Sequence, residues 1–150
     1  MGRGECWDLA AQALNQSGAL WDGAYAFGKR LDLNRDCVFP GDIIQFENVQ
    51  VQYTKQNAVY RETMDHHTAV VFSVDENKNM ILAEQNTSDG GKRVRLSEFI
   101  PGNVRTGNVY VYRPVSPWSQ RYVWMSFSRT WIALLLITVP GPNTKLTPAL

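Results

Sequence analysis

Residues 67–86, HTAVVFSVDENKNMILAEQN, contain two apolar runs rich in β-branched residues, separated by a short polar turn. Runs of this kind, at 68–74 and 80–86, are typical of β-strands. The four polar residues 75–78 between them are enough for a tight connection. The sequence therefore predicts an antiparallel hairpin, and the other elements are placed around it.

The register of this hairpin brings polar residues together. If 75–78 form the loop, Val74 lies opposite Asn79, and the same register sets Ala69 opposite Glu84 and His67 opposite Asn86. Side chains alternate between the two faces of a strand. His67, Glu84 and Asn86 are therefore predicted to share one face.

A helix is predicted before the hairpin, at residues 6–16 (CWDLAAQALNQ). Its apolar residues recur at helical spacing from Cys6 to Leu14, and Ser17-Gly18 supplies a stop. Cys6 then lies in the first turn, on the buried side. Further strands are predicted at 42–46, 92–96 and 108–113, with a polar loop at 54–65. The pattern predicts an α+β fold, with one N-terminal helix packed on an antiparallel sheet of five or six strands.

Cys6 and His67 together indicate nucleophilic catalysis. A cysteine attacks as the thiolate, and a helix N-terminus and a neighbouring imidazole both favour that form. The imidazole needs a polar partner that fixes its tautomer and orientation. Glu84 and Asn86 both lie within reach on the next strand. Hairpin register favours Asn86 as that partner, and the backbone N–H of Cys6 would donate to an oxyanion.

Several short motifs resemble one family of enzymes. They are GECW at 4–7, GDIIQF at 41–46, HTAVV at 67–71, EQN at 84–86 and VYVYRP at 109–114. Together they resemble CHAP domains of the NlpC/P60 superfamily of papain-like cysteine peptidases and amidases. The resemblance implies catalytic roles for Cys6, His67, Glu84 and Asn86, with Glu84 as the third member. It also implies cleavage of amide or peptide bonds, often in peptidoglycan, through an acyl-enzyme and without a cofactor.

A second function stays open beside hydrolysis. A similar cysteine-proteinase-like domain lies at the end of some fungal actin-patch proteins. That likeness implies a non-catalytic interaction or adaptor domain. The expected partner of an enzyme is a peptide or amide substrate, including a cell-wall peptide. Thiol reactivity of Cys6, with Cys37 as internal control, separates the two functions.

Composition narrows the other classes of function. A net charge of +1 gives no argument for nucleic-acid binding. Two cysteines make no disulfide framework, and no secretory signal precedes the helix, so the cytoplasm is the default location. His66 and His67 are adjacent, but they lack the further ligands at metal-site spacing that zinc requires, so no metal site is predicted.

The motifs end by Pro114, so a domain boundary is predicted at 116. Residues 1–116 form the hydrolase-like domain and 117–150 a tail, apolar at first and then rich in Pro and Thr. The apolar run at 131–139 is much shorter than the roughly 20 residues that a membrane span needs. Docking on the domain, binding of a protein partner and contact with a membrane through 118–139 all stay open.

Overall fold

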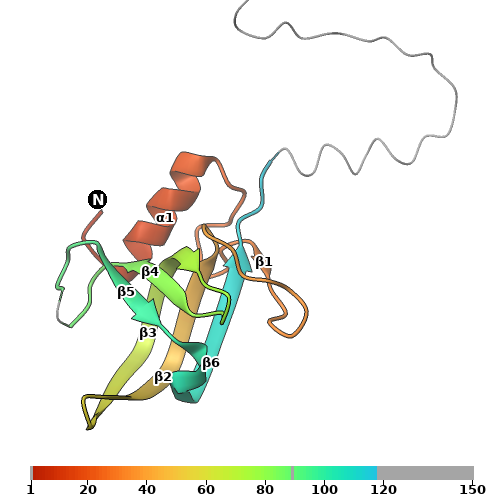
Figure 1. Ribbon diagram of the computed structural model, residues 1–150. Helices are drawn as coiled ribbons and strands as arrows, with labels where there is room; N and C mark the ends of the chain where they lie inside the picture. The colour runs from red at the N-terminus through yellow and green to blue at the C-terminus, as the bar shows by residue number, and fades with distance from the viewer. Residues whose placement is uncertain (1, 89, 118–150) are drawn as a thin grey trace, which may run out of the picture.

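A single six-stranded sheet carries one helix in the computed structural model, which describes residues 2–88 and 90–117. All neighbouring strands are antiparallel, in the order β1-β6-β2-β3-β4-β5 (Figure 1). In chain order the elements are α1 (Cys6–Ser17), β1 (Lys29–Arg30), β2 (Ile43–Lys55), β3 (Ala58–Val74), β4 (Met80–Glu84), β5 (Arg95–Phe99), the 3₁₀ turn η1 (Pro101–Asn103) and β6 (Val104–Arg113). The predicted α+β class, with a helix on five or six antiparallel strands, is confirmed.

Helix α1 begins at Cys6 as predicted and ends at Ser17, one residue later than predicted. The Asp8 carboxylate accepts the backbone N–H of Glu5 at 3.0 Å, which satisfies one of the donors left free at the helix start. Gly18 ends the helix in the left-handed conformation, with φ of 68°. The N-terminus of α1 is therefore anchored at the point where Cys6 begins the first turn.

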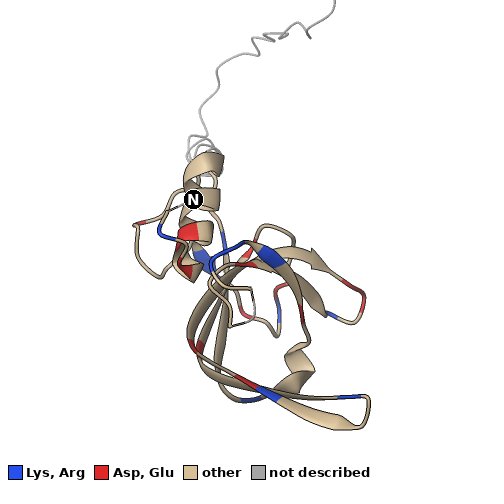
Figure 2. Ribbon diagram, turned by 90° about the vertical axis from the view of Figure 1, so that its left-hand side faces the viewer, with Lys and Arg blue, Asp and Glu red and all other residues tan. Residues whose placement is uncertain are grey.

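The sheet separates two apolar clusters. On one face, α1 packs Ala10 and Leu14 against Phe27 and Ile43. The other face curls around a larger core, as the turned view shows (Figure 2). This second cluster is built from inward residues of five strands, β2 to β6, among them Ile44, Phe46, Ala69, Val71, Leu82, Phe99 and Val111. The curled face is called the concave face below.

The β3–β4 hairpin has the predicted register at one end only. Ala69 lies opposite Glu84, as predicted. At the turn, however, Val74 pairs with Met80 and not with Asn79, so that part of the prediction is wrong. A one-residue irregularity between Val71 and Ser73 absorbs the difference, as a β-bulge does.

Strand β4 is also shorter than predicted. It ends at Glu84, and Asn86 lies beyond it with φ of 62°. The pairs between β3 and β4 end at Ala69–Glu84, so His67 has no residue opposite it on β4. This early end of β4 decides which polar side chain reaches the imidazole.

The predicted loop at 54–65 is wrong. β2 and β3 continue through this region as a long hairpin arm, paired up to Lys55–Ala58. Gln56 and Asn57 turn the chain with φ of 50° and 63°, the two positive values that a tight two-residue hairpin turn requires. Polar side chains exposed on both faces hid the strand, because an arm without a core side shows no apolar alternation.

Two smaller differences concern the edges of the sheet. β5 runs from Arg95 to Phe99, three residues later than the strand predicted at 92–96. β1 was not predicted; it is two residues long and pairs with the end of β6.

Within the described ranges, no helix combines the length and apolar character that crossing a membrane requires. The predictions for the tail fall on residues 118–150, outside the described part of the chain.

Candidate active site

Cys6, His67 and Glu84 meet at the start of α1. Cys6 is the first residue of the helix and is half-buried, and its thiol hydrogen-bonds the imidazole of His67. His67 Nε2 donates to Glu84 Oε2 at 3.0 Å, and both residues are buried. Because Nε2 is engaged by Glu84, Nδ1 is the ring nitrogen left for Cys6. The structure thus joins three of the four predicted residues in one chain of contacts.

The surroundings of Cys6 favour the thiolate. Burial alone would raise the pKa of the thiol, but the hydrogen bond from His67 and the backbone N–H of Thr68 outweigh it. The positive charge of His67 and the backbone N–H of Trp7 act in the same direction. The pKa of Cys6 is therefore lowered, as nucleophilic cysteines require.

His67 is shifted in the opposite direction. Burial would lower its pKa, but hydrogen bonds to Cys6 and Glu84, with the negative charges of both, raise it to about 9. The ring also lies against Phe46, with centroids 6.1 Å apart and planes 28° from parallel. The lowered pKa of the thiol and the raised pKa of the imidazole both favour a thiolate–imidazolium pair over the neutral pair.

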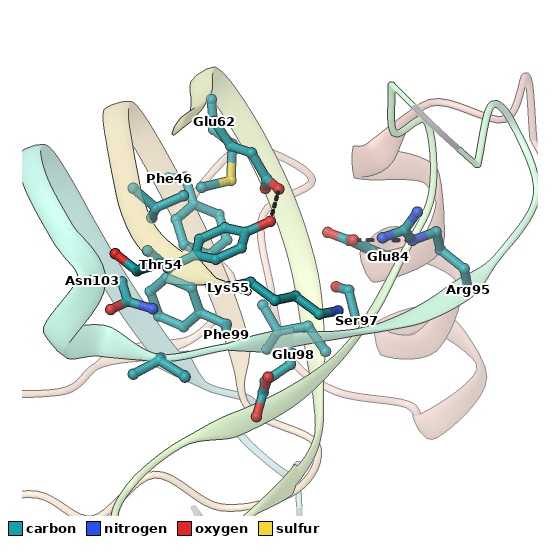
Figure 3. A pocket seen from close by; sticks show the side chains of 15 residues that line it. Phe46, Thr54, Lys55, Glu62, Glu84, Arg95, Ser97, Glu98, Phe99 and Asn103 are labelled. Carbon is teal, nitrogen blue, oxygen red and sulfur yellow. Dashed lines mark hydrogen bonds and ion pairs between the residues drawn. The ribbon is translucent and has the colours of Figure 1, made fainter. Parts of the chain in front are cut away.

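Glu84 is held by further contacts on its far side. Burial would raise its pKa, but hydrogen bonds from His67 and Ser97 lower it, together with the charges of His67 and Arg95. Arg95 Nε lies 3.5 Å from Glu84 Oε1, and Figure 3 shows this ion pair at one side of a cavity. Glu84 is therefore ionised and fixed, as a group that orients a catalytic histidine must be.

The structure places Asn86 at a different contact. Its side-chain N–H donates to Glu5 Oε2 at 2.7 Å, and Lys92 Nζ reaches Glu5 Oε1 at 2.9 Å. Glu5 directly precedes Cys6. Asn86 thus lies beside the helix start that carries the thiol, and Glu84 is the side chain on His67.

Because β4 ends early, the start of α1 can lie against Thr68 of β3. Thr68 lies one residue beyond the last β3–β4 pair, so its backbone N–H has no β4 carbonyl opposite it in the register. The sulfur of Cys6 takes this N–H instead. The helix start therefore fits into the gap that β4 leaves, next to His67.

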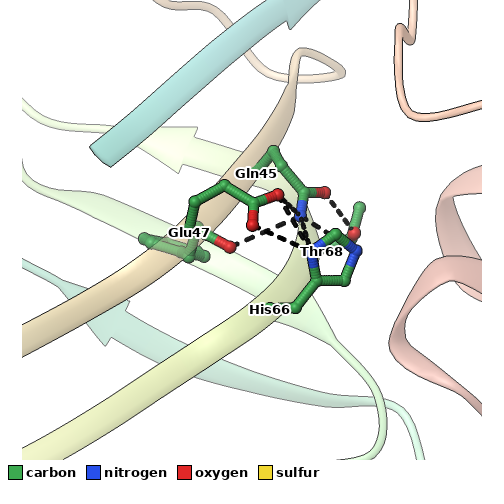
Figure 4. A network of polar contacts seen from close by, with 5 residues as sticks. Gln45, Glu47, His66 and Thr68 are labelled. Carbon is green, nitrogen blue, oxygen red and sulfur yellow. Dashed lines mark hydrogen bonds and ion pairs between the residues drawn. The ribbon is translucent and has the colours of Figure 1, made fainter. Parts of the chain in front are cut away.

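A polar network behind Thr68 was not predicted from the sequence. The Thr68 hydroxyl donates to Gln45 Oε1, and Gln45 Nε2 donates to Glu47 Oε1 at 2.9 Å; both Thr68 and Gln45 are buried (Figure 4). Glu47 accepts from His66 Nδ1 at 2.9 Å. These side chains lie on the sheet face opposite His67. The only sign of them in the sequence is that His66 and Thr68 flank His67, and that Gln45 and Glu47 lie in the segment IIQFE at 43–47. They fix the strand position whose backbone N–H holds the thiol.

No metal centre accompanies these residues. Across residues 2–88 and 90–117, no three His, Cys, Asp or Glu side chains converge as a metal site would require. The groups present are a thiol with a lowered pKa, an imidazole with a raised pKa and a carboxylate, joined in one chain of contacts. That set can attack a carbonyl carbon and protonate a leaving group.

A helix-borne cysteine beside a strand-borne histidine, on a curled antiparallel sheet, defines the class of cysteine-proteinase-like folds. A family model for the AIM3/BBC1 cysteine proteinase-fold domain matches residues 1–125. The chain belongs to this family. No curated protein and no solved structure matches the chain at a significant level.

Proposed function

We propose that this protein is a cysteine-dependent hydrolase of amide or peptide bonds, acting through an acyl-enzyme. The carrying observation is the opposed pKa shifts of Cys6 and His67, held in line with Glu84. Burying charged groups costs stability unless they are well paired. A protein that only kept the fold would not need a thiolate, an imidazolium and a carboxylate in one chain of contacts. Their arrangement therefore supports catalysis.

The chemistry follows from the resting charges. The Cys6 thiolate attacks the carbonyl carbon, and the backbone N–H of Cys6 at the helix start donates to the oxyanion. The His67 imidazolium gives its proton to the leaving amine, and the C–N bond breaks. His67, now neutral, takes a proton from water as the water attacks the thioester. Release of the carboxylic acid restores the thiolate and the imidazolium, while Glu84 keeps the ring oriented.

The residues that resemble CHAP domains support amide bonds as the target, with peptidoglycan as one substrate class and peptides as another. Asn86 keeps its proposed place in the site through Glu5, the residue before the nucleophile.

A non-catalytic adaptor is the second candidate function. The observation in its favour is the family description, which names a fold and two proteins but no reaction. In that case the Cys6–His67 pair would be a structural remnant, and Cys6→Ala would leave every property except thiol chemistry unchanged.

An acyl-transfer assay separates the two functions. Full-length protein and Cys6→Ala are mixed with p-nitrophenyl acetate, and the Cys6 peptide is followed by mass spectrometry. The hydrolase predicts a burst of nitrophenol, a transient acetyl group on Cys6, and turnover that Cys6→Ala lacks. Nitrophenol release that is equal in both proteins, with no acetyl group on Cys6, would favour the adaptor. Peptidoglycan fragments and peptide amides then define the substrate.

A further inference from the structure

One edge of strand β3 is open beside the candidate site. β3 pairs with β2 from Ala58 to Val70, but it pairs with β4 only from Ala69 to Val74. Over the described part of the chain, no strand pairs with the β4 side of residues 58–67. An open strand edge presents unpaired backbone groups, which form a template for an added strand.

Cys6 stands at the end of this open edge. Its sulfur accepts the backbone N–H of Thr68, the residue that follows 58–67 in β3. In a sheet, a carbonyl oxygen of the neighbouring strand would occupy that acceptor position. An extended chain lying along 58–67 would therefore run directly to the sulfur, with its own carbonyl group beside it.

A cavity of about 550 Å³ lies on the concave face beside the same edge. Glu62 of β3 lies on one side, and Glu84 and Ser97 lie on the other (Figure 3); Met64 of β3 also lines the cavity. Its volume lies in the range of roughly 300–1,000 Å³ that small-ligand sites occupy. The cavity is positioned to receive side chains from a strand added to β3.

The lining of the cavity indicates which side chain it takes. Phe46, Leu82 and Phe99 give it an apolar floor, and all three belong to the buried core. Charged residues of both signs, Lys55 and Glu98, also line it. An apolar side chain fits the floor, and the mixed charges favour neither an acidic nor a basic peptide.

We propose that the substrate is an extended peptide, which adds to the open edge of β3 as a further strand. One apolar side chain enters the cavity, and the backbone carries the scissile carbonyl to Cys6. This inference rests on the proposed hydrolase function and specifies its substrate class. It favours a peptide chain, whose backbone can pair with β3, over a small amide that lacks such a backbone.

The test compares electrophiles that differ only in the peptide they carry. A library of acetylated tripeptidyl chloromethyl ketones, varied at each position, is reacted with the full chain and compared with chloroacetone. We expect at least ten-fold faster labelling of Cys6 by members with an apolar residue at one position. N-methylation of alternate backbone amides in those members should remove the gain. If no member exceeds chloroacetone ten-fold, or if N-methylation has no effect, the proposal is wrong.

Two matched variants locate the effect. Met64 lines the cavity, whereas Thr63, its neighbour, is exposed and lies outside the lining. Met64→Lys should lower the ratio of peptidyl labelling to iodoacetamide labelling at least five-fold, while Thr63→Lys should leave this ratio unchanged. Equal effects of the two variants would contradict the proposed location.

Iodoacetamide separates this inference from the proposed function. Fast iodoacetamide labelling without any peptidyl gain would leave the thiol site intact and reject the strand-addition proposal. Slow labelling by every reagent would reject both. A second copy of the chain is the other occupant that an open edge admits. A Cys6→Ala dimer that protects residues 58–67 from hydrogen exchange would assign the edge to self-association and overturn the proposal.

Discussion

Three side chains form the proposed site, and the protonation state of each depends on its neighbour. Cys6 gains thiolate character from His67, and His67 keeps its proton because Glu84 faces its other nitrogen. The sequence indicated Cys6 and His67 by their places at a helix start and on a strand. It left Glu84 and Asn86 open because the choice depends on where β4 ends, and a difference of two residues at a strand terminus is not encoded in periodicity.

Glu84 and Asn86 can be separated by substitution. Glu84→Gln removes the charge facing His67, so the pKa of His67 should fall from about 9, and the rate of acyl transfer should fall roughly 10²-fold. Asn86→Ala removes only a hydrogen bond to Glu5, so the pKa of His67 should stay close to its value in the unaltered protein. Proton NMR titration of the His67 ring measures its pKa in both variants. A larger fall of the pKa in Asn86→Ala than in Glu84→Gln would assign the orienting role to Asn86.

At the scale of elements, a bulge-like bend in β2 interrupts its pairing with β6. Asn48 has φ of 52°, and the β2–β6 register shifts between Glu47 and Gln50. Gly107 lies across from this irregularity with φ of 88°, and a Cβ atom there would collide with the carbonyl oxygen of Asn48. Glycine is required at this position because both the backbone conformation and the close approach exclude a side chain.

Gly107→Ala should therefore destabilise the fold. A strained left-handed residue with a backbone collision is expected to lower the free energy of unfolding by about 1–3 kcal/mol. Gly102→Ala is the matched control, because a Cβ atom there would meet no atom within 4 Å and its φ is ordinary; its effect should stay within roughly 0.5 kcal/mol. Urea unfolding followed by tryptophan fluorescence measures both. Equal stabilities of the two variants would contradict the account of the bend.

The elements that the sequence predicted are those with one buried face. α1, the start of β2 and the strand at 68–74 show apolar periodicity, and the structure confirms them. The hairpin arm around Gln56 was read as a loop because neither of its faces is buried. The bulge near Phe72 shifts the β3–β4 register by one residue, and no local residue pattern signals it.

At the scale of the whole molecule, β6 is the last strand of the described residues. β6 ends at Arg113, whose side chain donates to the Asp42 carboxylate at 2.8 and 3.0 Å, joining the last strand to the start of β2. Asp42 is buried and also accepts the backbone N–H of Phe39. This contact joins the last described strand to the start of β2, and the boundary at 116 stays a prediction.

A chain ending at Ser116 is accordingly expected to fold cooperatively, with a thermal midpoint close to that of the full chain. It should also be more soluble, because residues 118–139 add several apolar side chains. The family match reaches residue 125, so a chain ending there is the natural comparison. Scanning calorimetry and solubility assays measure the three lengths. If the chain ending at Ser116 is unfolded while the one ending at 125 folds, the boundary lies later than predicted.

The charge state of Cys6 is the sharpest check on the proposed thiolate–imidazolium pair. Iodoacetamide labelling of the full chain is followed by mass spectrometry from pH 5 to pH 10, with Cys37, an exposed cysteine outside the site, as the internal comparison. Because the pKa of Cys6 is lowered, its labelling should reach a plateau at a lower pH than that of an ordinary thiol, and at pH 6 it should be at least ten-fold faster than that of Cys37. The rate should change again near pH 9, where His67 loses its proton, and His67→Gln should move labelling to alkaline pH. Labelling of Cys6 that rises only near the pKa of about 8.5 of an ordinary thiol, and that is the same in His67→Gln, would contradict the thiolate–imidazolium pair and the function built on it.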